Sequence, residues 1–380
     1  MPYPSALPNI YTNEVLGFNL GGLNGSTDPV SEDCLTLSIW VPRGSRKNLP
    51  VLVFSYGGAF MTGRTDVPYQ IPAQCVQRSQ AHIAVSFNHQ GNIFGFPNAG
   101  GLSSNQQNLG LLDQRLAIEW VRENIASFSG DPTRIGLWGM SSGAIAIAYY
   151  SYSYVHDLIA NGLILNSGNE FIDILSRDPA HTNFNCVASH FGCGNLPPLI
   201  ELHCMRRVNA HAIKDFLRTY FDSGSTPPLI ISPIIDNRTV FPNYPAIAQA
   251  GHIANLPVLL GSNAEDGIPF VPYPPSPSGL TLADEMTTRF FLCSTLQAAK
   301  ARLSAGTGPV CRYVYAGNFS NVSPKGWMGA YHGAELPVVF GTHAMFGGNS
   351  TELEWRTSWA MQDLWVRFVA KGGRGIGVEG

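Results

Sequence analysis

Short apolar runs alternate along this chain with longer segments whose apolar positions suit a helix. The short runs predict buried strands, and they cover residues 36–41, 51–55, 135–138, 257–260 and 312–315. The longer segments predict helices over residues 144–150, 200–208, 210–220 and 352–370. Strands that alternate with helices in this way predict an α/β fold with a mostly parallel central sheet.

The same pattern divides the chain into regions of one large domain, residues 1–380. Residues 35–170 hold the alternation that builds the sheet, and we expect residues 171–230, which are rich in helical patterns, to form a cap. Residues 1–28 are rich in Pro, Gly and Asn and predict an irregular arm, and residues 372–380 predict a flexible tail.

Composition indicates a large buried core and gives no reason to expect several kinds of partner. Charged residues make up 13% of the chain, whereas about 25% is usual, and there are 40 Gly and 27 Pro. The net charge of −3 gives no reason to expect nucleic acid or an anionic membrane as a partner, and no apolar run of about 20 residues predicts a membrane span. The histidines lack the spacing of metal ligands, so we expect neither a metal nor another cofactor.

A candidate nucleophile lies where one strand meets the next helix. The sequence Gly-Met-Ser-Ser-Gly at 139–143 follows the strand predicted at 135–138 and precedes the helix predicted at 144–150. Small residues two before and two after Ser141 permit a sharp turn that exposes its hydroxyl. The helix N-terminus behind it favours negative charge. In this context Ser141 is interpreted as the nucleophile of a catalytic elbow.

The other groups that such a serine requires follow in a particular order. The strand at 51–55 ends in a Gly-rich turn, where the N–H groups of Gly58 and Ala59, with that of Ser142, are candidates for an oxyanion hole. A carboxylate follows the strand at 257–260, either Asp266 or Glu265. His332 comes later still, and the order serine, acid, histidine is that of α/β-hydrolases.

These motifs make the chain resemble the type B carboxylesterase and cholinesterase-like family of α/β-hydrolases, with an appearance typical of its fungal members. The resemblance spans most of residues 31–341 and rests on segments 31–35, 56–60, 92–96, 108–115, 120–132, 139–143, 166–168, 261–267 and 332–341. It implies an α/β-hydrolase fold with a helical cap. It also implies a serine hydrolase that cleaves uncharged carboxylic esters of small molecules through an acyl-enzyme, with no cofactor.

The resemblance also implies roles for single residues. Ser141 would be the nucleophile, His332 the general base and Asp266 the acid that orients it. Ser167 would support these three from behind. The oxyanion hole would be formed by the N–H groups of Gly58, Ala59 and Ser142.

Four departures from the family pattern modify these expectations. Asp266 stands where the family usually has Glu, which keeps the adjacent Glu265 as a competing acid. Met140 replaces a common acidic residue, which argues against cationic choline esters. In the family an arginine pairs with the acid at the position of Glu32, and Gln90 stands here in place of that arginine. Either Glu32 is therefore less buried in this chain, or Gln90 and water form its hydrogen bonds. The family's N-terminal hairpin has no counterpart before residue 31.

Cysteines and processing signals point in different directions. Cys193 and Cys204 have the spacing of a family disulfide, although Cys186 competes for either partner. The family is often secreted, but residues 1–16 contain no basic and apolar stretch that predicts a signal peptide, so the location is left open. The number of subunits is also left open. Asn-x-Ser/Thr sequences begin at Asn24, Asn237, Asn318, Asn321 and Asn349.

Two other functions remain open on the sequence. The family includes binding proteins that lost their catalytic residues, and this chain retains Ser141, Asp266 and His332. The same three groups also support acyl transfer or cyclisation when an alcohol replaces water.

Overall fold

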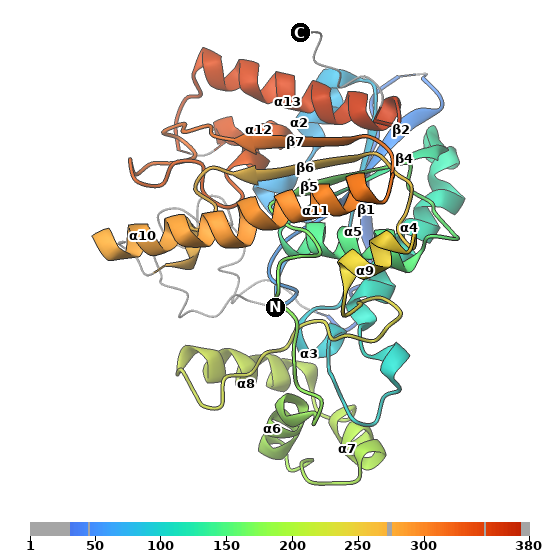
Figure 1. Ribbon diagram of the computed structural model, residues 1–380, viewed down its shortest axis with the longest axis vertical. Coiled ribbons are helices and arrows are strands. Elements are labelled where there is room, and N and C mark those ends of the chain that lie inside the picture. The colour runs from blue at the N-terminus through green and yellow to red at the C-terminus, as the bar shows by residue number, and fades with distance from the viewer. Residues whose placement is uncertain (1–30, 45, 272–275, 346, 374–380) are drawn as a thin grey trace.

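A seven-stranded sheet organises the computed structural model, which describes residues 31–44, 46–271, 276–345 and 347–373. Its strand order is β1-β3-β2-β4-β5-β6-β7 (Figure 1). β1 is antiparallel to β3, and every other neighbouring pair is parallel. The strands are β1 (Leu37–Trp40), β2 (Leu49–Ser55), β3 (Ile83–Phe87), β4 (Gly130–Met140), β5 (Gly162–Asn166), β6 (Val258–Asn263) and β7 (Val310–Tyr315).

Helices cover both faces of this sheet (Figure 1). The face with Val51 and Val53 packs on α4 (Leu109–Asn124), α5 (Ser142–Ser153) and α11 (Cys293–Ser304). The face with Leu52 and Phe54 packs on α12 (Glu335–Phe340) and α13 (Glu352–Ala370), with α2 (Ala73–Ser79) beside it. Neighbouring residues of β2 thus point to opposite faces, and both faces are buried, as in α/β proteins.

A separate group of helices lies at the end of the molecule away from α13 (Figure 1). It contains α6 (Thr182–His190), α7 (Pro198–Met205) and α8 (Ala210–Asp222), which share one apolar cluster. The Cys193–Cys204 disulfide joins the loop before α7 to α7 itself. The family disulfide is therefore present, and Cys186 remains a free thiol. The assignment of residues 171–230 as a cap stays a prediction.

The remaining elements connect these layers. They are α3 (Asn92–Gly95), α9 (Tyr244–Gln249), α10 (Pro277–Met286), the π-helix η6 (Thr287–Leu292) and the short 3-10 segments η2 (Pro68–Gln70), η3 (Ser104–Gln106), η4 (Ile125–Phe128), η5 (Ile268–Phe270) and η7 (His343–Met345).

The α/β-hydrolase architecture predicted from the sequence is confirmed, and each individually predicted strand and helix is present within a few residues. β3, β5 and the continuous run α10-η6-α11 were not predicted one by one. The arm at 1–28 and residues 374–380 of the predicted tail lie outside the described residues. Glu32 is exposed, which resolves the question raised by the missing arginine, because an exposed carboxylate needs no partner.

Candidate active site

The candidate site lies at the carboxyl ends of the parallel strands. Ser141 follows β4, Ser167 follows β5, and Asp266 and His332 follow β6 and β7. Loops at this edge converge in open α/β sheets, and ligands bind there where neighbouring connections leave in opposite directions. Here α2 leaves β2 on one face, whereas α5 leaves β4 on the other.

Ser141 has a backbone conformation that most residues avoid. Its φ is 55° and its ψ is −126°, and its N–H donates to the Asn166 carbonyl at 2.8 Å. A Cβ at position 139 would lie 2.5 Å from the Gly143 carbonyl carbon, and one at position 143 would lie 2.2 Å from the Ser55 carbonyl oxygen. Both positions therefore require glycine, and the turn between them holds Ser141 at the start of α5.

Asp266 and His332 form a buried pair across 66 residues of sequence. Asp266 Oδ1 lies 2.8 Å from His332 Nδ1. Its other oxygen, Oδ2, accepts from the Ser167 hydroxyl at 2.9 Å and from the Asn263 backbone N–H at 2.7 Å. With both oxygens engaged, the carboxylate has one orientation, and it fixes the imidazole ring in turn.

Glu265 points to a different part of the histidine loop. Its Oε2 accepts from the Ala330 N–H at 2.6 Å, and its own N–H donates to the Ala330 carbonyl at 3.1 Å. A Cβ at Gly329 would clash with this carboxylate, at 2.4 Å from Oε2. Glu265 therefore secures the loop that carries His332, whereas Asp266 contacts the imidazole.

His332 is enclosed by aromatic rings. Its side chain is 10% exposed, and the ring centroids of Phe270 and Phe291 lie 5.2 and 5.0 Å from its own. Its Nε2 is buried and has no hydrogen-bond partner among the described residues, Ser141 included. The nitrogen that faces away from Asp266 is thus uncommitted, which is the condition for accepting a proton.

The Gly-rich turn after β2 has three consecutive residues with positive φ. Gly58, Ala59 and Phe60 have φ values of 121°, 55° and 60°. Among the described residues, the N–H groups of Gly58 and Ala59 donate to no acceptor. Ser142 begins α5, so its N–H precedes the first bond within that helix. Among the described residues these three N–H groups are thus unused, and their assignment to an oxyanion hole stays a prediction.

A second buried carboxylate lies behind the Asp266–His332 pair. Glu335 is fully buried, and its Oε2 accepts from Asn263 Nδ2 at 2.5 Å. Asn263 Nδ2 also donates to the Tyr331 carbonyl at 2.7 Å. Burial raises the pKa of Glu335, and the nearby Asp266 raises it further. Glu335 thus packs under the histidine loop, and Asn263 links it to the acid.

Sequence reasoning missed four residues of this site. Asn263 holds the acid, and Thr287 accepts from the Gly267 N–H at 2.8 Å through its hydroxyl oxygen. Phe270 and Phe291 cover the imidazole. Asn263 could have been predicted, because polar residues directly follow the apolar strand predicted at 257–260. No spacing signal marked the aromatic residues, because they reach His332 through the fold alone.

Asp113 and Arg115, which the sequence places near a helix start, have structural partners. Asp113 accepts from the Gln90 N–H at 3.0 Å, and the buried Arg115 pairs with Glu119 and Asp157. Neither residue belongs to the candidate site.

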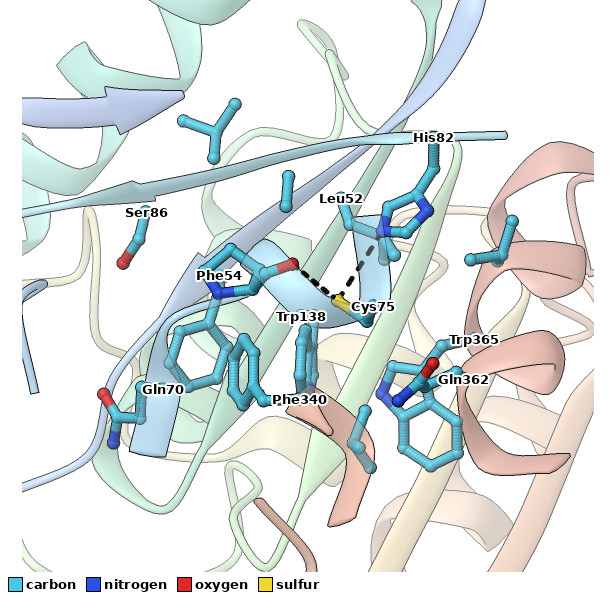
Figure 2. Close-up of a pocket in the computed structure, with 15 residues that line it drawn as sticks. Leu52, Phe54, Gln70, Cys75, His82, Ser86, Trp138, Phe340, Gln362 and Trp365 are labelled. Carbon is cyan, nitrogen blue, oxygen red and sulfur yellow. Dashed lines mark hydrogen bonds between the residues drawn. The ribbon is translucent and has the colours of Figure 1, made fainter. Parts of the chain in front are cut away.

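A separate cluster of reactive side chains lies on the face of the sheet that α2, α12 and α13 cover, beside a small cavity (Figure 2). Cys75 Sγ donates to the Pro72 carbonyl at 3.1 Å and lies 4.0 Å from His82 Nε2, while His82 Nδ1 lies 2.7 Å from Ser79 Oγ. The cavity is lined mainly by apolar groups, among them Leu52, Phe54, Trp138, Phe340 and Trp365.

The chemistry of this second cluster opposes catalysis. Burial raises the pKa of the Cys75 thiol to about 12 and lowers the pKa of His82 to about 4. Both groups are therefore neutral near pH 7, whereas a nucleophilic cysteine needs a thiolate. We interpret this cluster as part of the core.

Two further findings concern ligands and membranes. Within the described ranges, no three His, Cys, Asp or Glu side chains are grouped so as to hold a metal ion. The helices of the same residues include none that is both long and apolar enough to cross a membrane.

The sequence is similar to known ester hydrolases. The profile of the Carboxylesterase family matches residues 17–280 and 275–375. A chlorogenic acid esterase of Aspergillus niger is 46% identical over 371 residues, which is 96% of this chain and 70% of that protein. Secreted lipase 5 of Gibberella zeae is 42% identical over 92% of this chain and 70% of its own. A mouse cholinesterase is 29% identical over 64% of this chain and 41% of its own.

Proposed function

Since this chain belongs to the carboxylesterase family and is a carboxylic ester hydrolase, we propose that it cleaves uncharged esters through an acyl-enzyme formed on Ser141. The observation that carries this proposal is the 2.8 Å contact between Asp266 Oδ1 and His332 Nδ1. It leaves His332 Nε2 without a hydrogen-bond partner among the described residues, at the edge of the sheet where Ser141 stands in a strained turn.

In the first half of the reaction, Ser141 Oγ attacks the ester carbonyl and His332 Nε2 takes its proton. Asp266 keeps the proton of neutral imidazole on Nδ1 and offsets the positive charge that develops on the ring. The carbonyl oxygen becomes an oxyanion, to which Gly58, Ala59 and Ser142 donate through their N–H groups. Because these groups are already free, no internal hydrogen bond has to break first.

In the second half, the tetrahedral intermediate collapses and His332 gives its proton to the leaving alkoxide. A water molecule then attacks the acyl group on Ser141, and His332 again acts first as base and then as acid. The products are a carboxylic acid and an alcohol, and Ser141 regains its proton.

The surroundings of the site support an uncharged substrate with an apolar acyl group. Met140 stands next to Ser141 in place of a carboxylate, so no negative charge at that position attracts a cation. Phe270 and Phe291 present aromatic surface beside the imidazole. We infer that an aromatic acyl group binds well against these rings. The name of the Aspergillus niger relative, a chlorogenic acid esterase, agrees with that inference.

The experiment that tests the proposal treats the purified protein and Ser141→Ala with a fluorophosphonate probe, which labels activated serines. Release of p-nitrophenol from short-chain esters is followed in parallel. We expect labelling and turnover in the wild type and the loss of both in the variant. Ser142→Ala is the matched control, because its backbone N–H remains.

Other outcomes separate the remaining functions. A protein that melts cooperatively but neither labels nor turns over is a binding relative, and the proposal is then wrong. A protein that labels and yields a new ester with an added alcohol, at the expense of free acid, is an acyl transferase.

A further inference from the structure

Helix α7 buries its acidic residue and exposes two of its aliphatic ones. Leu199 and Ile200 are 62% and 53% exposed, whereas Glu201 is 5% exposed. Glu201 Oε1 accepts from Asn185 Nδ2 at 2.7 Å, which satisfies one of its oxygens inside the protein. Surface helices normally show the opposite arrangement. The outward aliphatic face of α7 therefore needs an explanation beyond the stability of this chain.

The exposed apolar surface extends along the loop before α7. Leu196, Pro197 and Pro198 are exposed, so five consecutive apolar residues, 196–200, face outward. Leu199 and Ile200 lie in the first turn of α7, and Leu196 lies just before the helix begins. Contiguous apolar surface of this kind marks an interaction site in many proteins.

This surface is held in place from both sides. The Cys193–Cys204 disulfide encloses residues 196–200, and its Cα atoms are 5.6 Å apart. The inner residues Leu202 and Met205 pack in the apolar cluster shared with α6 and α8. The apolar run is thus displayed by a rigid support, and ordering it on contact costs little entropy.

Two arginines lie at the other end of α7 from the apolar run. Arg206 and Arg207 follow α7 directly, and both are exposed. Neither forms a salt bridge with any residue that the structure describes. The chain as a whole has a net charge of −3, so this local positive charge was not evident from composition.

We propose that residues 196–200, with Arg206 and Arg207, form a docking surface for a negatively charged lipid–water interface. The aliphatic side chains enter the boundary between headgroups and acyl chains, and the guanidinium groups bind the anionic headgroups. A second copy of this chain is the alternative occupant, and the test below separates it from a lipid surface. The surface lies at the end of the molecule away from α13 (Figure 1).

Sedimentation with vesicles tests this proposal on the full chain without reductant. One set of vesicles contains phosphatidylcholine and phosphatidylserine, and another contains phosphatidylcholine alone. We expect the wild type to bind the anionic vesicles and Leu199→Ser/Ile200→Ser to bind them at least about tenfold less. Arg206→Gln/Arg207→Gln should weaken binding about fivefold for each charge on anionic vesicles, with little effect on neutral ones.

The matched control is Leu353→Ser, which removes a leucine that is 67% exposed on α13. We expect it to bind like the wild type, and thermal melting of each variant verifies folding. Sedimented protein is measured, so the result does not depend on Ser141 or on ester hydrolysis. The proposal is wrong if the wild type fails to bind anionic vesicles, or if the control loses as much binding as the double variant. It is also wrong if Leu199→Ser/Ile200→Ser dissociates a dimer of the chain and leaves vesicle binding unchanged.

Discussion

Two potential nucleophiles of this chain differ in what surrounds them. Ser141 is partly exposed in a strained turn at the edge of the sheet, and His332 Nε2 has no hydrogen-bond partner in the part of the chain that the structure describes. Cys75 is buried beside His82 on the face that α2, α12 and α13 cover, and burial raises the pKa of its thiol to about 12. Residue type alone does not distinguish Ser141 from Cys75 as a nucleophile, because the fold contains a candidate histidine for each. Two features distinguish them: the exposure of the side chain and the carboxylate that contacts His332.

The first prediction concerns the choice between two adjacent acids. In Asp266→Asn the side-chain oxygen still accepts from Ser167 and Asn263, which turns the amide NH₂ toward His332 Nδ1. The imidazole then adopts the wrong tautomer, and we expect kcat to fall by roughly 10³- to 10⁴-fold. Steady-state hydrolysis of p-nitrophenyl esters measures this loss.

Glu265→Gln is the control for that substitution. Its carbonyl oxygen still accepts from the Ala330 N–H, so we expect kcat to remain within about threefold of the wild type. A larger loss in Glu265→Gln than in Asp266→Asn would contradict the assignment of Asp266.

At the scale of elements, the run α10-η6-α11 supplies the surroundings of His332. Its middle portion, Thr287–Leu292, is a π-helix, and such segments occur often at functional sites. The Thr287 hydroxyl accepts a hydrogen bond from the Gly267 N–H, in the turn that carries Asp266. Phe291, four residues later, packs on the imidazole of His332. This short segment therefore fixes both the acid loop and one wall of the site.

The second prediction tests the role of that wall. Phe291→Leu keeps an apolar side chain but removes the ring beside His332, so we expect kcat/KM for aromatic acyl esters to fall about three- to tenfold relative to acetate esters. Competition between the two classes of ester measures the ratio directly.

Phe290 offers a matched control on the same π-helix, because its side chain is exposed. We expect Phe290→Leu to leave the ratio unchanged. Equal changes in both variants would show that the substitutions act through the helix and not through contact with the substrate.

At the scale of the whole molecule, stability depends on the two apolar layers that sandwich the sheet. The layer under α2, α12 and α13 also contains His82, which is 2% exposed (Figure 2). Burial lowers the pKa of His82 from 6.5 to about 4. Between these pH values the unfolded chain binds a proton that the native protein does not, so stability falls as the pH falls.

The third prediction follows from that difference. Between pH 7 and pH 4.5, we expect the free energy of unfolding to fall by about 2–3 kcal/mol more in the wild type than in His82→Gln. Gln is neutral at both pH values and retains an amide that can bond to Ser79. Urea unfolding at the two pH values measures the difference. Identical declines would show that His82 is not held neutral by the fold.

The amount that sequence could predict differs between the parts of the site. Ser141 was predictable because a short motif with glycines at 139 and 143 surrounds it. The contact that demands Gly139 lies within that turn, whereas Gly143 is demanded by the Ser55 carbonyl of β2. The order of Asp266 and His332 was predictable because each follows a recognisable strand. Phe291 was not predictable, because its contact with His332 crosses 41 residues and depends on how a π-helix packs on the acid turn.

By itself the sequence determined the α/β alternation, the turn that carries Ser141 and the identity of the groups at the strand ends. These can be recognised from short motifs and from the period of apolar residues, which are written in neighbouring positions. Only the tertiary structure decided that Asp266, and not Glu265, contacts His332, and that α7 turns Leu199 and Ile200 outward while it buries Glu201. Those outcomes depend on distances between segments that are remote in sequence, and residue type and spacing do not contain such distances.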